Sequence, residues 1–190
     1  MSTSTLSKPG VTQDYRATIA GLHAGYGIPG DYAETRQLPL CEEAKELVSI
    51  GPDSLGRDQR MTPQAAAAWQ RMQTDASKAG VQLLVVSAYR SVDYQCALIQ
   101  RKLDRGLKIA DILKINAAPG YSEHHTGRCV DITTPGFTPL EEEFEHSPAF
   151  AWLQRNAATY RFALSYPRGN RHGIAYEPWH WCWRARSPRH

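Results

Sequence analysis

The amino-acid sequence predicts an α+β fold, in which a small, mostly antiparallel sheet is flanked by helices. Three observations support this class. Segments of helical and strand pattern follow one another without the regular β-α-β alternation of a parallel sheet. The strand-type runs are short, as in Val81–Ser87 (VQLLVVS). The 190 residues contain no internal repeat, and their number suits one domain or one domain with an appendage.

Composition excludes several function classes. With 42% hydrophobic residues and a formal net charge of +3, the chain is too apolar and too weakly charged to be disordered. It has no apolar run of about 18 residues, so we expect no membrane span. The 22 basic and 19 acidic residues are scattered without a basic stripe, so we expect no nucleic-acid partner.

Residues 1–60 are expected to form an irregular N-terminal extension. Thr12–Leu22 has the pattern of a short helix, which the glycines and the proline between positions 25 and 30 should end. Gly51–Gly56 has the composition of a turn-rich link. The opening MSTSTLSKPG shows no secretory signal peptide. We therefore expect a protein that is cytoplasmic as encoded, or that reaches the periplasm or cell wall by another route or after trimming.

Residues 61–190 have a clearer pattern and are expected to form the main domain. Thr62-Pro63 supplies a helix N-cap and first residue, and Ala65–Lys78 favours a helix that Gly80 ends. Val81–Ser87 follows as a strand that we expect to be buried on both faces.

A second helix is expected to begin after Ser91, which has the side chain of an N-cap. Its pattern would turn Tyr94, Leu98 and Ile99 inward, and it should end near Gly106. The order of elements up to this point is helix, strand, helix.

The remaining elements alternate less regularly. Lys108–Ile115 suggests a short helix and Gly127–Thr133 a strand. Ser147-Pro148 opens a helix that should run to about residue 159. Phe162–Tyr166 and Ile174–Trp183 have the composition of strands.

Two imidazoles and one carboxylate in this half of the chain could hold a metal ion. His124, Asp131 and His180 match the ligand types of a catalytic zinc site, which has three protein ligands and one open position. Asp131 lies in an apolar strand, where a carboxylate is costly unless it is paired or bound to a metal. If the strands that carry Asp131 and His180 are neighbours, these residues meet on one sheet face. Glu177, three residues before His180, could then act beside the metal without binding it.

Each of these residues also has an ordinary structural interpretation. A single histidine is most often a hydrogen-bonded, half-buried side chain. Arg90, at a helix start, could be a surface guanidinium, and Glu177, before a proline, a solvated turn residue. The conjunction of these placements favours a functional site. His125 follows a ligand on an alternating backbone and should point away from the metal.

Three motifs in this chain resemble those of the zinc D-alanyl-D-alanine carboxypeptidases of the VanY type, which have the hedgehog/D,D-peptidase fold. The first is Ser-x-Tyr-Arg-Ser…Gln over residues 87–95. The second is Pro-Gly-Tyr-Ser-Glu-His-x-Thr-Gly-x-x-x-Asp over residues 119–131, and the third is Tyr-Glu-Pro-Trp-His over residues 176–180. The similarity covers about residues 61–183, which marks residues 61–190 as a zinc peptidase catalytic domain.

The resemblance implies a role for each matched residue. One zinc ion per chain would be held by His124, Asp131 and His180. Glu177 would be the catalytic base, and Arg90 would bind the scissile carbonyl oxygen. Ser122 and Gln95 stand where relatives contact the terminal carboxylate or the peptide of the substrate. Apart from the resemblance, the aromatic side chains near the site, among them Tyr89 and Trp179, could wall a groove for a short peptide. The aromatic residues could equally be ordinary core and rim packing.

This chain departs from the family pattern at three places. Arg128-Cys129 stands where relatives usually carry small or aliphatic residues, no arginine precedes Tyr166-Pro167, and the loop 168–172 is basic. These departures leave the chemistry intact but bear on substrate preference.

The four cysteines, Cys41, Cys96, Cys129 and Cys182, form no CxxC pair, which argues against a zinc ribbon or a thioredoxin-type motif. Free, largely buried thiols are the favoured expectation for a chain of this length. Strand alternation places Cys129 on the face of Asp131 and Cys182 on the face of His180. Packing is favoured for this pair as well, with a disulfide and metal ligation as the alternatives.

The resemblance implies a zinc peptidase that removes the C-terminal D-alanine from a peptidoglycan stem peptide or its precursor. Two alternatives stay open. The same zinc site could serve an endopeptidase of phage-lysin or effector type, which the lack of a visible signal peptide somewhat favours. A zinc-binding module without catalysis is the third possibility, and Glu177 and Arg90 argue against it because a structural site needs neither. The oligomeric state is left open.

Overall fold

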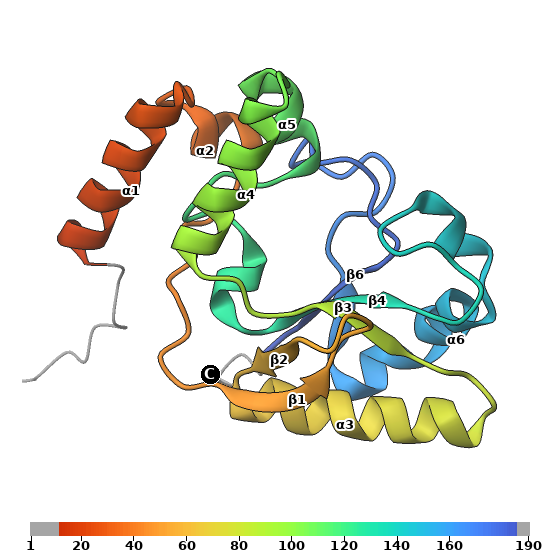
Figure 1. Ribbon diagram of the computed structural model, residues 1–190. Coiled ribbons are helices and arrows are strands. Elements are labelled where there is room, and N and C mark those ends of the chain that lie inside the picture. The colour runs from red at the N-terminus through yellow and green to blue at the C-terminus, as the bar shows by residue number, and fades with distance from the viewer. Residues whose placement is uncertain (1–11, 186–190) are drawn as a thin grey trace, which may run out of the picture.

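Two antiparallel sheets organise the chain in the computed structural model, which describes residues 12–185 (Figure 1). The smaller sheet is a hairpin of β1 (Val48–Pro52) and β2 (Asp58–Met61). The larger sheet has the order β3-β4-β6-β5, with every neighbouring pair antiparallel: β3 (Leu84–Ser87), β4 (Cys129–Thr133), β6 (His180–Trp183) and β5 (Phe162–Leu164). The predicted α+β class with a small antiparallel sheet is confirmed.

Helices surround these sheets. Figure 1 shows α1, α2, α4 and α5 grouped at one end of the molecule, with α3 along the other side beneath the hairpin. Within residues 12–185, no helix combines the length and the apolar character needed to cross a bilayer. The α-helices are α1 (Gln13–Tyr26), α2 (Tyr32–Arg36), α3 (Pro63–Lys78), α4 (Val92–Asp104), α5 (Ile109–Ile115) and α6 (Pro148–Asn156). Three short 3₁₀ segments complete them: η1 (Glu123–Thr126), η2 (Glu142–His146) and η3 (Ala157–Tyr160).

The first helix begins as predicted but ends four residues later. The Thr12 hydroxyl accepts a hydrogen bond from the Tyr15 amide, as an N-cap does. The helix runs through Gly25 to Tyr26, and Gly27 caps it, because its φ of 65° is in the left-handed region that glycine adopts readily. A glycine inside a helix costs only about 1 kcal/mol, so Gly25 does not have to be a stop.

The segment predicted to be irregular also contains the β1–β2 hairpin. The sequence Val-Ser-Ile-Gly-Pro of β1 has the glycine and proline that usually mark a turn, and the pairing is irregular between Ser49 and Gly51. Asp53 closes the hairpin because its carboxylate accepts hydrogen bonds from the Leu55 and Arg57 amides. These contacts form a turn that composition alone described only as a link.

The main core lies between α3, α6 and the larger sheet. Trp69 and Met72 of α3 and Val130 and Ile132 of β4 have no exposed surface. The helix begins at Pro63 after the Thr62 cap, as predicted. The strand expected at Val81–Ser87 is shorter and is not buried on both faces, since Leu84 is 37% exposed.

The phase of α4 differs from the prediction. Ser91 caps the helix as expected, with its hydroxyl accepting from the Tyr94 amide at 3.0 Å. The buried residues are Val92, Gln95 and Ile99, while Tyr94 is 43% exposed. Their spacing of three and four residues defines one helical face. A pattern of apolar residues does not predict this face, because one of its buried residues is a glutamine.

The last strands are shorter than predicted because residues 165–179 leave the sheet. The predicted strand Ile174–Trp183 contributes only β6, and Phe162–Tyr166 only β5. The indole Nε1 of Trp181 donates to the Pro178 carbonyl at 2.9 Å, which holds the turn that leads into β6. The helices predicted at Lys108–Ile115 and after Ser147 are present as α5 and α6.

Cys129 and Cys182 are joined by a disulfide, so the favoured expectation of free thiols is wrong for this pair. The reason is the register of β4 and β6, in which Cys129 lies directly opposite Cys182. Cys41 and Cys96 are free, as expected. Sequence alternation gave the shared face of the pair, but the register was needed to show that the two side chains meet.

Candidate metal centre and active site

The register of β4 and β6 also brings Asp131 opposite His180. Asp131 Oδ1 lies 3.0 Å from His180 Nδ1, and both side chains are almost fully buried. The strands that carry the two residues are neighbours, so the acid and the imidazole share one sheet face, as the sequence predicted. Burial by itself lowers the pKa of His180, but the flanking carboxylates of Asp131 and Glu123 raise it to about 10.

His124 reaches the same point from the 3₁₀ turn η1. Gly127 ends that turn in a left-handed conformation, where a side chain would meet Leu47 and Ala44. The Nδ1 atom of His124 donates to the Ala88 carbonyl, so the Nε2 atom of the neutral ring is unprotonated and carries a lone pair. Burial, aided by Arg90, lowers the pKa of His124 to about 4, so the ring is neutral near pH 7.

This arrangement fits a metal ion. The buried Nε2 of His124 has no hydrogen-bond partner within residues 12–185, yet it lies 3.2 Å from Asp131 Oδ2. A nitrogen lone pair and a carboxylate oxygen repel each other unless a cation lies between them. The ligand atoms of His124, Asp131 and His180 all lie within 4.8 Å of one another. Two imidazoles and a carboxylate are the donors that zinc takes at catalytic sites.

The ionisation of Asp131 agrees with this interpretation. Burial alone would raise its pKa, but the facing rings of His124 and His180 hold the pKa well below its usual range. The residue is therefore a carboxylate at neutral pH and is almost fully buried within β4. A cation at this position would compensate the cost of burying that charge.

Glu177 stands beside the candidate metal centre on the turn before β6. Its Oε2 atom lies 3.9 Å from His180 Nδ1, and its side chain is 14% exposed. The turn is fixed by hydrogen bonds from the Glu177 amide to the Tyr166 carbonyl and from the His180 amide to the Glu177 carbonyl. Burial raises the pKa of Glu177 to about 7, against the opposing effect of His180. A carboxylate with such a pKa can both take and return a proton near neutral pH.

Arg90 follows β3 and points into the same pocket. Its Nη1 atom lies 4.0 Å from Asp131 Oδ2, and its side chain is 17% exposed. Its buried Nε atom has no hydrogen-bond partner among the described residues, which leaves a donor available to a ligand. The Arg90 carbonyl accepts from His125 Nδ1, and His125 Nε2 accepts from the Gly120 amide. His125 therefore points away from the metal centre, as predicted, and supports the loop.

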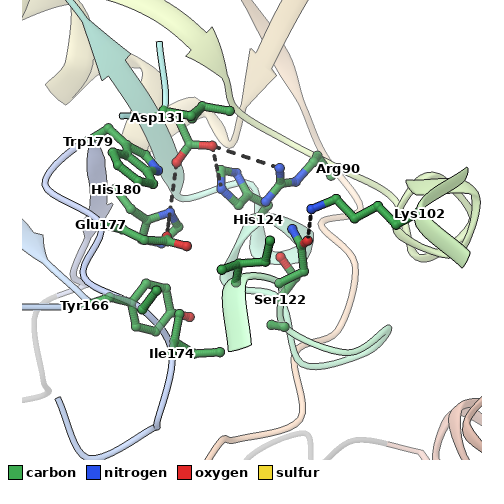
Figure 2. A pocket seen from close by; sticks show the side chains of 15 residues that line it. Arg90, Lys102, Ser122, His124, Asp131, Tyr166, Ile174, Glu177, Trp179 and His180 are labelled. Carbon is green, nitrogen blue, oxygen red and sulfur yellow. Dashed lines mark hydrogen bonds and ion pairs between the residues drawn. The ribbon is translucent and has the colours of Figure 1, made fainter. Parts of the chain in front are cut away.

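A pocket of about 250 Å³ connects these groups (Figure 2). We call the side with His124, Asp131, Glu177 and His180 the reactive end. We call the side with Lys102, Asn116 and Ser122 the recognition end. Figure 2 shows Glu177 and His180 on one side and Lys102 on the other, with His124 and Arg90 between them. Both carboxylates that line the pocket belong to the reactive end.

Lys102 is the cation of the recognition end. Its ammonium group donates to the Asn116 side-chain oxygen, which aims it across the pocket. Burial, followed by the nearby charge of Arg90, lowers the pKa of Lys102. Lys102 and Asn116 were not among the site residues predicted from the sequence. The available signal was the position of Lys102 seven residues after Gln95 on α4, which places both on one helical face.

The predicted substrate contacts divide into two groups. Ser122, which is 3% exposed, and Trp179 line the pocket. Gln95 and Tyr89 are not among the pocket-lining residues. The Gln95 amide donates to the Ala117 carbonyl at 2.8 Å and so holds the loop behind the pocket. The Tyr89 hydroxyl lies 3.4 Å from a Glu43 carboxylate oxygen, away from the reactive end.

Comparison with known proteins finds similar carboxypeptidases. Residues 58–186 match the family described as "VanY: D-alanyl-D-alanine carboxypeptidase". The chain is 33% identical over 168 residues to YodJ of Bacillus subtilis (strain 168), covering 85% of this chain and 58% of that protein. It is also 33% identical over 171 residues to a D-alanyl-D-alanine carboxypeptidase of Enterococcus faecium, covering 88% and 51%. The chain thus spans between half and three fifths of these relatives.

Solved structures give the same result. The LdcB LD-carboxypeptidase superimposes with a TM-score of 0.67 and 31% identity, over 76% of this chain and 71% of that one. A variant of the vancomycin-resistance D,D-pentapeptidase VanY, in complex with Zn(II), gives a TM-score of 0.59 and 26% identity, over 77% and 82%. The fold of this chain therefore matches carboxypeptidases named for two different bond types.

Proposed function

This chain belongs to the VanY family of D-alanyl-D-alanine carboxypeptidases, and we propose that it is a zinc-dependent peptidase that removes the C-terminal D-alanine from peptidoglycan stem peptides. The observation that carries the proposal is the pairing of a fitting zinc site with Glu177 in one pocket whose other end is cationic. A structural zinc site would need neither Glu177 nor Arg90.

His124, Asp131 and His180 would hold the zinc ion. When bound, zinc supplies a Lewis acid that polarises a carbonyl group and makes water more acidic. The three ligands come from η1, β4 and β6, and the sheet fixes two of them by direct strand pairing. The zinc complex of the VanY structure supports the choice of metal.

Glu177 would move the proton. As a carboxylate it takes a proton from the attacking water, and as the acid it returns that proton to the amine that leaves. Its burial suits both steps because a raised pKa makes the carboxylate a better base. Arg90 would donate hydrogen bonds to the carbonyl oxygen as negative charge develops on it. The unpaired buried Nε of Arg90 supports this role.

The recognition end favours a carboxypeptidase over an endopeptidase. A free chain end carries a carboxylate, which Lys102, Asn116 and Ser122 could bind through an ammonium, an amide and a hydroxyl. An endopeptidase must instead let the peptide chain continue past the scissile bond, and the half-buried ammonium group of Lys102 would then have no anionic partner. We therefore place the terminal D-alanine at the recognition end.

A second candidate keeps the same centre but cuts the bond between an L-configured centre and D-alanine. The similarity to the LdcB LD-carboxypeptidase, with its TM-score of 0.67, is the observation that favours it. Both candidates remove one terminal D-alanine, and they differ in whether a pentapeptide or a tetrapeptide stem is the substrate.

Digestion of purified muropeptides followed by mass spectrometry tests the proposal. We expect pentapeptide stems to lose one alanine and tetrapeptide stems to persist. Loss of alanine from tetrapeptides instead would establish the L,D specificity, and cleavage of crosslinked dimers would establish an endopeptidase. Unchanged muropeptides with the zinc-loaded protein would refute peptidase function, provided that a known carboxypeptidase digests the same preparation.

The Cys129–Cys182 disulfide supports a proposal about compartment. Structural disulfides persist in oxidising surroundings and are rare in the cytosol. We therefore propose that the enzyme acts in the periplasm or cell wall, where peptidoglycan is also found. Fractionation of the producing cells with thiol labelling checks this: the pair should resist alkylation before reduction, and a fully alkylated pair would argue for the cytoplasm.

A further inference from the structure

We propose that Glu123 is a positioning residue that holds the His180 ring in the one orientation able to bind the metal. The inference rests on the proposed zinc site and extends it to a residue that does not touch the metal centre. Glu123 Oε2 lies 3.1 Å from His180 Nε2, on the side of the ring opposite the metal centre. His180 Nδ1 faces Asp131 at 3.0 Å. Each ring nitrogen therefore has its own carboxylate.

Ring packing alone cannot fix this orientation. The His180 ring lies between two aromatic neighbours, with centroids 4.9 Å from Tyr166 and 4.8 Å from His124. These contacts set the plane of the ring. A half-turn about the bond that joins the ring to its Cβ leaves that plane unchanged but exchanges Nδ1 with a carbon. The metal centre would then face a carbon atom.

The hydrogen bond to Glu123 removes that ambiguity. A half-turn would replace Nε2 with a carbon at the Glu123 carboxylate and break the contact. The contact between Asp131 and Nδ1 also favours this ring orientation, but Asp131 is itself a candidate metal ligand. When the oxygens of Asp131 bind the metal, the Glu123 carboxylate still accepts a hydrogen bond from Nε2–H. The proton therefore stays on Nε2, and the lone pair of Nδ1 is available to the metal. Such outer partners commonly orient histidine ligands.

Glu123 is itself anchored on its other side. Its Oε1 atom accepts from Arg184 Nη1 at 3.0 Å, and Arg184 Nη2 donates to the Ser165 hydroxyl at 3.0 Å. The Glu123 side chain is 18% exposed, and its Oε2 atom lies 3.1 Å from Cys182 Sγ of the disulfide. The two oxygens thus have separate partners, so rotation of the carboxylate would break both contacts.

Zinc affinity without substrate provides the test. We expect Glu123→Ala to weaken the zinc Kd by roughly 10- to 100-fold, measured by competition with a chromophoric chelator. Glu123→Gln should recover most of the affinity, because its amide oxygen can still accept from Nε2–H. With cobalt in place of zinc, the visible spectrum of Glu123→Ala should change in band position, which a loss of stability alone would not cause.

Two matched variants control for general destabilisation. Glu43→Ala removes a half-buried carboxylate that bonds the Val92 amide, away from His180, and should leave the zinc Kd unchanged. Arg184→Met keeps Glu123 but frees one of its oxygens, and should weaken the zinc Kd less than Glu123→Ala. The thermal midpoint of each apoprotein reports on folding separately.

The outcomes separate this inference from the proposed function. Wild-type protein that binds no zinc would overturn both. Wild-type protein that binds zinc and cleaves stem peptides, while Glu123→Ala binds zinc within twofold of it, would overturn only the role of Glu123. Equal losses in Glu123→Ala and Glu123→Gln, or a comparable loss in Glu43→Ala, would also contradict a positioning hydrogen bond.

Discussion

The two ends of the pocket are built on different principles. At the reactive end, His124, Asp131 and His180 are almost completely buried, and each is fixed by a second contact. At the recognition end, a flexible lysine is aimed by a single amide oxygen. The first arrangement suits chemistry, which needs fixed distances, and the second suits the capture of a charged chain end. Substitutions at the two ends should therefore change different kinetic constants.

The largest effect is expected from Glu177→Ala at the reactive end. Loss of the proton carrier should lower kcat by about 10²- to 10⁴-fold with a similar KM. The variant should still bind one zinc ion, since Glu177 is not a ligand. Metal analysis and initial rates on a pentapeptide check both statements, and full activity would remove Glu177 from the mechanism.

Arg90→Met comes next, because Arg90 lies between the two ends. Loss of an oxyanion donor should lower kcat by about 10²- to 10³-fold. If Arg90 serves mainly the terminal carboxylate, KM will rise and kcat will hold. Steady-state kinetics with the native and the C-terminally amidated peptide would show which end it serves.

Ionised Glu177 should also destabilise the metal-free protein, because its carboxylate is buried at the reactive end. Its pKa is about 7 in the folded chain against an ordinary 4.5, so the folded state binds more protons between these values. The protonated side chain does not lower the free energy of unfolding below about pH 4.5. As the pH rises through 7 and the buried side chain ionises, the free energy of unfolding falls by on the order of 3 kcal/mol. Denaturant unfolding of metal-free Glu177→Gln should show less loss between pH 5 and 8 than the wild type. Parallel curves would contradict the raised pKa.

The smallest effect is expected from Lys102→Met at the recognition end. A hydrogen bond between charged groups contributes about 1.5–3 kcal/mol, so KM should rise by roughly 10- to 100-fold while kcat changes little. Amidation of the substrate should weaken binding to the wild type by a similar factor and to Lys102→Met hardly at all. A fall in kcat with an unchanged KM would contradict the assignment of substrate binding to the recognition end and of chemistry to the reactive end.

The sequence was informative where residue type and local pattern suffice. Asp131 stood out because an acid in an apolar strand needs a partner, and Glu177 and His180 because they are three residues apart beside a proline. Contacts that depend on register or on a helical face were harder to anticipate. Cys129 and Cys182 meet only because β4 and β6 pair in one register. Gln95 was placed at the substrate, yet it is buried on the inner face of α4.

The hairpin shows a second limit of local patterns. Gly51 and Pro52 are common turn residues, so β1 was expected to be a link. The structure shows that an irregular pairing accommodates the glycine and that Asp53 closes the turn with its side chain. These are interactions between residues several positions apart, which composition does not encode.

The covalent link between β4 and β6 has a consequence for the order of assembly. Cys129 and Cys182 lie two residues before Asp131 and two residues after His180, so their bond holds the ligand-bearing strands together independently of a metal. Many small zinc domains fold only as they take up the ion. This chain should instead remain folded when a chelator strips it, and regain activity when zinc is returned. Loss of zinc would then inactivate the protein reversibly, because the folded apoprotein can bind the ion again.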